Sequence, residues 1–432
     1  MMRSKKKLFL IGIKSVLLLA IIITICSNRK QPQQTTGEPT KEYISLNGLI
    51  TNEDSQHEDL AGLDRKITSY MTKWHLKGAS LSIIRNDSLV YAKGYGWAEE
   101  EKGIEMQPGH IMRMASVSKL LTAVGIMVLQ DRGELSIKDK VFGPDGILND
   151  SLFVATIKDK NYHKITIEHL LRHLGGFYRD PVFSSRDVKH QMGLDHAPTK
   201  EDFYRLVLRH RLRHQPGTSH KYSNFGYMLL SEVIEKVSGK PYAQFMKEDV
   251  FAPAGCYDMH IAGTYYDDRR ENEVRYYTHE GDGKYIEEYT DSGVMVERCY
   301  GGNNIPLLSG AGAWCGSTIE VTRLVASIDG RPETPDIISL EAVRQMTGYF
   351  DKETFSLGWN DTRPGSGWSR SGTLSGTCAY VKYFPDGECW TLITNTSTWK
   401  GPRQAKYTDA LFRECRKLYS KKLPARNLFE KQ

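Results

Sequence analysis

The stretch MASVSKLLTAVGIMVLQ, residues 114–130, decides the fold of this chain. It carries Ser116 and Lys119 at its beginning and is then almost uniformly apolar from Leu120 to Leu129. A helix that is apolar on all sides is buried in a protein core. The stretch therefore predicts a buried helix, with Ser116 and Lys119 at its start, three residues apart and on one face.

A serine and a lysine on one face of a helix can act together as a nucleophile and its base. The serine hydroxyl is a weak nucleophile that needs a neighbouring base and a site for the developing oxyanion. A buried lysine can be that base because burial lowers its pKa, and the helix N-terminus adds a positive dipole. The four-residue pattern is short, however, and on its own it is more often a capping serine followed by a surface lysine.

Two later segments carry side chains that suit the same site. Tyr222 and Asn224 lie on a turn ahead of a helix predicted at 230–237, where a phenol can relay a proton and an amide can orient a carbonyl. Near the C-terminus, Arg370, Ser371 and Gly372 lead into a strand. A glycine at that position allows a substrate backbone to lie close along the sheet edge.

The ordered set S-x-x-K, Y-x-N and cation-x-G resembles the serine β-lactamase and penicillin-binding-protein superfamily, in its class C, DD-peptidase and esterase branch. Gly310–Gly312 is similar to a later stretch of that branch, whereas Leu174–Gly176 departs from its usual polar-Ser-Gly. The resemblance covers roughly residues 60–420. It implies an α/β (α+β) fold, with an antiparallel sheet built from both chain ends, flanking helices and an inserted, mostly helical lobe.

The resemblance also implies a role for each motif residue. Ser116 would be acylated, and Lys119 and Tyr222 would carry the proton between it and the leaving group. Asn224 would bind the substrate amide, and the backbone N–H groups of Ser116 and Thr373 would form the oxyanion hole.

In the third motif, Arg370, Ser371, Gly372 and Thr373 would bind substrate. Arg370 stands where the family commonly has lysine or histidine. Arginine stays charged and suits a carboxylate, but it cannot shuttle a proton at ordinary pH.

The strand pattern independently places sheet elements at both ends of the chain. Two β-rich runs flank Asn86–Ser88, and two more, 378–384 and 389–395, flank Pro385–Gly387. With a two-residue turn, Cys389 would face Phe384, and Cys378 would lie too far along the strand for a 378–389 disulfide.

Other chemistries have weaker support in the sequence. The pairs His169/His173 and His210/His214 have helical spacing but lack a metalloprotease glutamate, so we expect ordinary histidines. Cys315 has no nameable base and is expected to be a packed cysteine. The arginine run 205–213 is expected to be the solvated face of an amphipathic helix. No metal or organic cofactor is implied.

The N-terminus predicts export. The first 25 residues contain five basic residues and no acid. Four of the basic residues precede an apolar run that ends at Cys26, and Lys14 interrupts that run. Residues 1–26 are expected to be a lipoprotein signal with Cys26 lipidated, an uncleaved anchor or a secretion signal. Residues 27–57 would be a flexible linker, 58–422 the hydrolase domain and 423–432 a tail. Localisation would be the periplasm or outer cell envelope, with membrane attachment through the N-terminus.

The charge balance argues against a nucleic-acid partner. The net charge is 58 − 52 = +6, but without the five leader cations it is 53 − 52 = +1. The predicted function is a serine hydrolase acting through an acyl-enzyme on a D-Ala peptide or a β-lactam. The alternatives are a carboxylesterase of the same fold and a non-catalytic, penicillin-sensing envelope module.

Overall fold

The computed structural model describes residues 45–288, 292–348 and 356–431. The predicted leader 1–26, including Cys26, and residues 27–44 of the predicted linker lie outside this range. Among the described residues, no helix combines the length and the apolar character that crossing a membrane requires.

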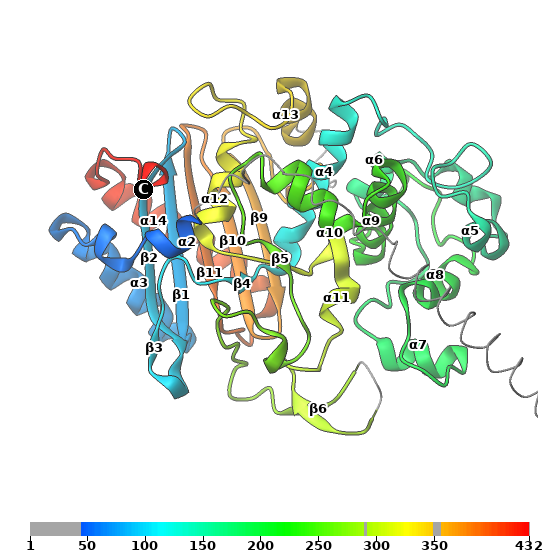
Figure 1. The fold of residues 1–432 in the computed structure, drawn as a ribbon, viewed down its shortest axis with the longest axis horizontal. Coiled ribbons are helices and arrows are strands. Elements are labelled where there is room, and N and C mark those ends of the chain that lie inside the picture. Colours follow the sequence, from blue (N-terminus) through cyan, green and yellow to red (C-terminus); the bar gives the residue numbers. More distant parts are fainter. Residues whose placement is uncertain (1–44, 289–291, 349–355, 432) are drawn as a thin grey trace, which may run out of the picture. The chain divides into compact units, whose positions relative to one another are not determined.

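A six-stranded antiparallel sheet forms the centre of the molecule, and both ends of the chain contribute to it, as predicted (Figure 1). Its strand order is β3-β2-β1-β11-β10-β9. Its strands are β1 (Gly78–Arg85), β2 (Ser88–Glu99), β3 (Ile104–Glu105), β9 (Trp368–Leu374), β10 (Thr377–Tyr383) and β11 (Glu388–Thr394). Two smaller sheets contain β4 (Met112–Arg113), β8 (Trp314–Gly316) and β5 (His260–Ile261), and the pair β6 (Lys284–Ile286) and β7 (Met295–Glu297).

Both predicted hairpins are present. Asn86 and Asp87 join β1 to β2 with φ angles of 46° and 59°, which a tight two-residue turn requires. The second hairpin has a three-residue loop ending at Gly387, whose φ is 89°. The extra residue shifts the register by one, so Cys389 faces Tyr383 rather than the expected Phe384.

The described cysteines make no disulfide, and the predicted absence of a 378–389 bond is confirmed. Cys378 faces Thr394, so it lies far along the hairpin from Cys389. The six described cysteines are all buried and free.

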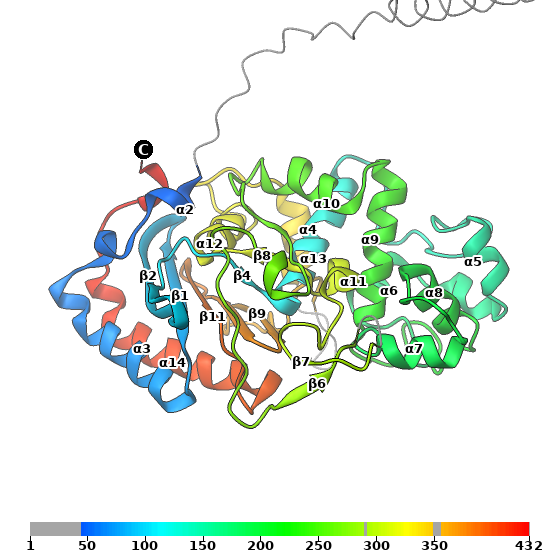
Figure 2. The same ribbon diagram turned by 60° about the horizontal axis from the view of Figure 1, so that its bottom comes forward.

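Helices cover both faces of the sheet, so the central strands β1, β10 and β11 are buried on both sides (Figures 1 and 2). On one face lie α3 (Ala61–Trp74) and α14 (Gln404–Tyr419), whose Phe412 ring is 5.5 Å from that of Trp390. On the other face lies α12 (Thr318–Ala326). Its first residue, Thr318, meets the hydroxyls of Ser80 and Ser82 at 2.7 Å each, so these buried polar groups are satisfied.

The helical lobe is formed by the part of the chain between β3 and β9. The predicted buried helix is α4 (Ser118–Asp131), and the helix predicted at 230–237 is the longer α9 (Asn224–Ser238), which Ser223 caps and Gly239 ends. The remaining helices are α2 (Leu46–Leu49), α5 (Ser151–Thr156), α6 (Ile167–Leu171), α7 (Ser185–Met192), α8 (Lys200–Leu208), α10 (Tyr242–Phe245), α11 (Ile305–Leu308) and α13 (Leu340–Thr347).

The folded body extends beyond the predicted domain limits 58–422. Residues 45–57 form α2 and a 3-10 turn, and Ser55 is buried with its hydroxyl on the Ala92 N–H at 2.9 Å. In the predicted tail 423–432, Leu428 is buried and Lys431 pairs with Asp54 at 2.6 Å. Both segments pack on the β2 side of the sheet, a long-range contact that local composition does not reveal.

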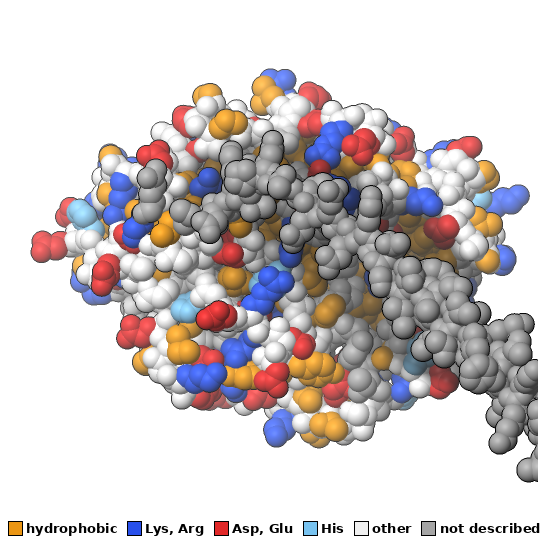
Figure 3. All heavy atoms as spheres, in the orientation of Figure 1, with side chains coloured by type: hydrophobic (Ala, Val, Ile, Leu, Met, Phe, Trp, Pro, Cys, Tyr) orange, Lys and Arg blue, Asp and Glu red, His pale blue; other side chains and the backbone are white. Residues whose placement is uncertain are grey.

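Figure 3 shows basic and acidic side chains interspersed on the visible face. In α8, Arg205 pairs with Glu201 at 3.0 Å, while Phe203 and Leu206 are buried, as expected of an amphipathic helix. The helix ends at Leu208, so Arg209, Arg211 and Arg213 of the predicted run lie beyond it, and that part of the prediction is wrong.

Candidate active site

The buried helix α4 begins beside Ser116, which lies in a 3-10 turn, Ala115–Val117. The turn is entered through Ala115, a non-glycine residue with a φ of 49°. Such strained residues are common at functional sites. Ser116 therefore lies just before the first residue of α4, and Lys119 lies in the first turn of that helix.

The Lys119 ammonium group is fully buried and bridges three acceptors. Its Nζ lies 3.1 Å from Ser116 Oγ, 2.8 Å from Asn224 Oδ1 and 2.5 Å from the carbonyl oxygen of Ala311. Burial lowers the pKa of Lys119, and the Arg370 charge lowers it further, against the opposing effect of Tyr222. Three acceptors match the three protons of an ammonium group, so the contacts hold Lys119 rigidly.

Tyr222 brings a second titratable group to the nucleophile. Its Oη lies 2.8 Å from Ser116 Oγ, and its ring lies 4.4 Å from that of His173. The partial burial of Tyr222 alone would raise the pKa of the phenol, but the charges of Lys119 and Arg370 outweigh it, and the pKa is lowered. The phenol is therefore biased toward its ionised form, which can accept a proton.

Asn224 opens helix α9, and an acid anchors it there. Asp180 Oδ2 accepts the backbone N–H groups of Asn224 at 2.5 Å and Phe225 at 3.3 Å. The Asn224 side-chain oxygen accepts from Lys119, so the amide that was expected to contact substrate also positions the lysine.

The third motif lies on β9, the edge strand of the large sheet, against the nucleophile turn. A Cβ on Gly372 would meet the Met114 carbonyl oxygen at 2.2 Å and the Ser116 nitrogen at 2.8 Å, so only glycine fits. The Ser371 N–H donates to Asn360 Oδ1 at 2.7 Å on the open edge of β9. Because alternate residues of a strand point their N–H groups the same way, the Thr373 N–H also faces that edge.

Arg370 differs from its expected role as a clamp for a substrate carboxylate. Its Nε donates to the Ser116 carbonyl oxygen at 2.8 Å, and the side chain is fully buried. Its Nη1 and Nη2 are inaccessible and have no hydrogen-bond partner among the described residues. In this conformation the guanidinium cannot touch a substrate, and it acts on Lys119 and Tyr222 through its charge.

Sequence reasoning missed several residues that complete the site. His173, with a φ of 61°, receives the Ser223 N–H on Nδ1 at 3.1 Å, and burial together with the Lys119 and Arg370 charges keeps its pKa far below the usual range. It therefore supports the Tyr222 ring as a neutral imidazole. Asp180 had no sequence signal, whereas the carbonyl of Ala311 lies within the Gly310–Gly312 stretch that the resemblance had marked.

The contacts of His169 and His210 agree with the ordinary character predicted for them, whereas His173 supports the Tyr222 ring. His169 Nδ1 accepts the Thr166 N–H at 3.2 Å as part of a helix cap, and His173 packs on Tyr222. The Tyr178 ring lies beside that of His210 at 5.4 Å. Within the described residues, neither pair belongs to a group that could hold a metal ion.

Comparisons of the sequence with protein families and with curated proteins point to the same family. A family model described as Beta-lactamase matches residues 63–412. A putative D-alanyl-D-alanine carboxypeptidase of Escherichia coli is 28% identical over 252 residues, covering 56% of this chain and 54% of that protein. The chain thus spans about half the length of the curated relatives it matches.

Two solved structures share the fold at low sequence identity. The octameric penicillin-binding protein homologue from Pyrococcus abyssi has a TM-score of 0.61 at 21% identity, covering 86% of this chain and 79% of its own. The D-alanine carboxypeptidase AmpC from Burkholderia cenocepacia has a TM-score of 0.60 at 19% identity, covering 83% and 99%. Both likenesses support the α/β fold with an antiparallel sheet.

Proposed function

The chain belongs to the beta-lactamase family, and on that premise we propose that it is a serine hydrolase that works through an acyl-enzyme on Ser116. The observation that carries the proposal is the meeting of Lys119 Nζ and Tyr222 Oη on Ser116 Oγ, at 3.1 and 2.8 Å. A binding module derived from this fold would not need both groups within hydrogen-bond range of the serine.

Acylation begins with attack of Ser116 Oγ on the substrate carbonyl carbon. The Ser116 proton passes to the Tyr222 phenolate, since Lys119 already directs its three donors at acceptors. The backbone N–H groups of Ser116 and Thr373 stabilise the oxyanion. Collapse of the resulting tetrahedral intermediate breaks the amide or ester bond, and the leaving group takes its proton from Tyr222.

Deacylation reverses these roles with water. Tyr222 accepts a proton from a water molecule that attacks the acyl carbon, and Ser116 leaves with that proton. The charges of Lys119 and Arg370 lower the pKa of Tyr222 and so stabilise its phenolate form.

The proposed substrate class is a D-amino-acid peptide with a free carboxylate, such as a D-Ala-terminated cell-wall peptide, with β-lactams as mimics. The buried Lys119 and Arg370 charges create a positive field at the nucleophile, and such a field favours an anionic substrate even without direct contact. The name of the Escherichia coli relative supports the same class. We further propose that the chain works in the cell envelope, attached through Cys26 or an uncleaved leader.

The test is release of D-Ala from an acyl-L-Lys-D-Ala-D-Ala peptide, compared with the matching L-Ala-terminated peptide and a neutral ester. D-Ala release that Ser116→Ala abolishes is the expected result. Turnover of the ester alone would indicate the carboxylesterase alternative, and no turnover with no covalent adduct would indicate the non-catalytic module.

A further inference from the structure

A compact group of three metal-binding side chains lies in the small sheet behind the nucleophile. His260 in β5 lies directly opposite Cys315 in β8, so the two side chains share a face. Glu273 comes from the segment that pairs with Ile111, just ahead of β4. The imidazole, carboxylate and thiol donor atoms all lie within 4.8 Å of one another, and all three residues are buried.

The donor atoms of His260 and Cys315 each approach a different oxygen of the Glu273 carboxylate, at distances that pairs of ligands on a tetrahedral ion would have. His260 Nε2 is 3.4 Å from Glu273 Oε2, and Cys315 Sγ is 3.6 Å from Glu273 Oε1. With bonds of about 2.05 Å to nitrogen, 2.1 Å to oxygen and 2.3 Å to sulfur, tetrahedral zinc separates nitrogen from oxygen by about 3.4 Å and sulfur from oxygen by about 3.6 Å. A direct charge-assisted bond from imidazolium to carboxylate would be shorter, about 2.7–2.9 Å.

The surrounding hydrogen bonds orient the three donors. His260 Nδ1 lies 2.9 Å from the carbonyl oxygen of Asp258, so Nδ1 carries the proton. His260 Nε2 then faces Glu273 Oε2 at 3.4 Å, so a cation between the two atoms would be bound by both. Glu273 itself accepts the Tyr276 hydroxyl at 2.7 Å and the Arg270 N–H at 3.3 Å, as ligating carboxylates commonly do.

The nearby Arg113 acts on Glu273 through its charge, but its terminal donors bond other groups. Its Nη1 donates to the carbonyl of Cys299 at 2.7 Å and its Nη2 to the carbonyl of Gly263 at 2.9 Å. The terminal guanidinium donors are therefore directed at backbone oxygens, not at Glu273.

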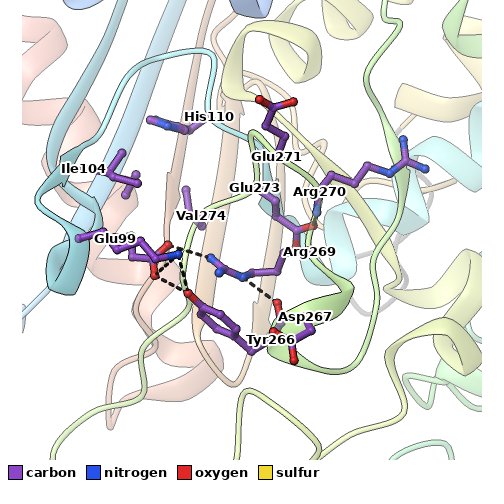
Figure 4. A pocket seen from close by; sticks show the side chains of 12 residues that line it. Glu99, Ile104, His110, Tyr266, Asp267, Arg269, Arg270, Glu271, Glu273 and Val274 are labelled. Atoms are coloured by element: carbon purple, nitrogen blue, oxygen red, sulfur yellow. Dashed lines mark hydrogen bonds and ion pairs between the residues drawn. The ribbon is translucent and has the colours of Figure 1, made fainter.

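The cluster also has a route from solvent. Glu273 lines a surface hollow of about 350 Å³, which Figure 4 shows between the β3 side and the segment that follows β5. The other acids lining it are Glu99, Asp267 and Glu271. An ion could reach the buried carboxylate through this hollow.

We propose that His260, Glu273 and Cys315 bind one zinc ion, with water as the fourth ligand. Binding exchanges the Cys315 thiol proton for the metal, so one proton is released and a zinc–thiolate bond forms. The ion would fasten β5 and β8 to the segment that carries Glu273. The Met114 N–H donates to the carbonyl oxygen of Trp314 in β8 at 3.0 Å. Because Met114 directly precedes the turn that carries Ser116, the zinc site would also stabilise that turn.

The test measures metal in the purified full-length protein after zinc loading and dialysis. We expect about one zinc per chain in wild type and a zinc affinity more than about 100-fold weaker in Cys315→Ala and Glu273→Gln, since loss of outer partners alone costs about 10–100-fold. Cys415→Ala, a buried cysteine in α14, is the matched control and should keep the zinc. Cys26→Ser should keep it as well, which excludes the leader thiol.

A second measurement does not depend on a variant that folds. X-ray absorption of the zinc-loaded wild type should show one sulfur ligand at about 2.3 Å among nitrogen and oxygen ligands. Zinc without a sulfur ligand, zinc that Cys315→Ala binds as tightly as wild type, or no stoichiometric zinc would overturn the proposal. The last outcome would mark the cluster as a buried His260–Glu273 ion pair and leave the hydrolase proposal unaffected.

Discussion

Replacing Tyr222 with phenylalanine separates two possible bases for the Ser116 proton. Tyr222 Oη is the nearer group, at 2.8 Å against 3.1 Å for Lys119 Nζ, and Lys119 has two further acceptors to satisfy. General base catalysis contributes about 10²–10⁴ in rate, or about 3–5 kcal/mol of transition-state stabilisation. We therefore expect Tyr222→Phe to lower kcat/KM by about a thousandfold.

Folding should be nearly unaffected by this change. The Tyr222 side chain is 36% exposed, and phenylalanine preserves the ring contact with His173 at 4.4 Å. The free energy of unfolding should change by less than about 1 kcal/mol.

The assay is hydrolysis of a chromogenic ester and labelling by a fluorescent penicillin, with thermal unfolding followed in parallel. Tyr227→Phe is the matched control, because its hydroxyl donates to the buried Leu171 carbonyl at 2.8 Å. The control should lose about 1 kcal/mol of stability and keep its acylation rate. Activity of Tyr222→Phe within threefold of wild type would refute the assignment and leave Lys119 as the base.

Three further changes test the surroundings of the site. Gly372→Ala should reduce labelling of Ser116 more than about 100-fold, because its Cβ would meet backbone at 2.2 Å, whereas Gly48→Ala, with open space around it, should label normally. Arg370→Met should raise the pKa of Tyr222 and so move the rising limb of kcat/KM to higher pH, and Arg370→Lys should leave the limb in place. Burial and the neighbouring Asp329 raise the pKa of Asp87 from the ordinary value of 3.8 to about 7, so the fold loses stability as pH rises from about 4 to about 7. Asp87→Asn should raise Tm most at pH 8, less at pH 5 and hardly at all at pH 3, and equal shifts at all three would contradict this.

The parts of the fold that sequence could predict are those with a strong local pattern. The apolar run after Lys119 predicted α4, and the turn residues at Asn86 and Gly387 predicted both hairpins. The register of the second hairpin was wrong by one residue, because Pro385, Asp386 and Gly387 form the loop together and the pattern does not reveal which of them pair.

The parts that sequence could not predict depend on contacts between distant segments. Ser55 and Leu428 are buried against the sheet, although the stretches around them are polar and lack periodicity. The sequence predicted that Arg370 binds a substrate carboxylate, but the side chain is buried against the Ser116 carbonyl oxygen. The residue type reveals the charge, but it does not reveal which way the side chain points.

The candidate site shows the same division. The motif residues Ser116, Lys119 and Tyr222 could be named from their order and spacing, and they meet in the structure. His173 and Asp180 carry no recognisable pattern, because each acts through one tertiary contact with the turn before α9.

The measurement that tests the central claim most directly is the intact mass of the protein after incubation with penicillin, followed by peptide mapping. The account predicts a penicilloyl adduct on Ser116 in wild type, or consumption of the penicillin if deacylation is fast, and neither in Ser116→Ala. An adduct on another residue, or penicillin turnover that survives in Ser116→Ala, would contradict the assignment of Ser116 as the nucleophile.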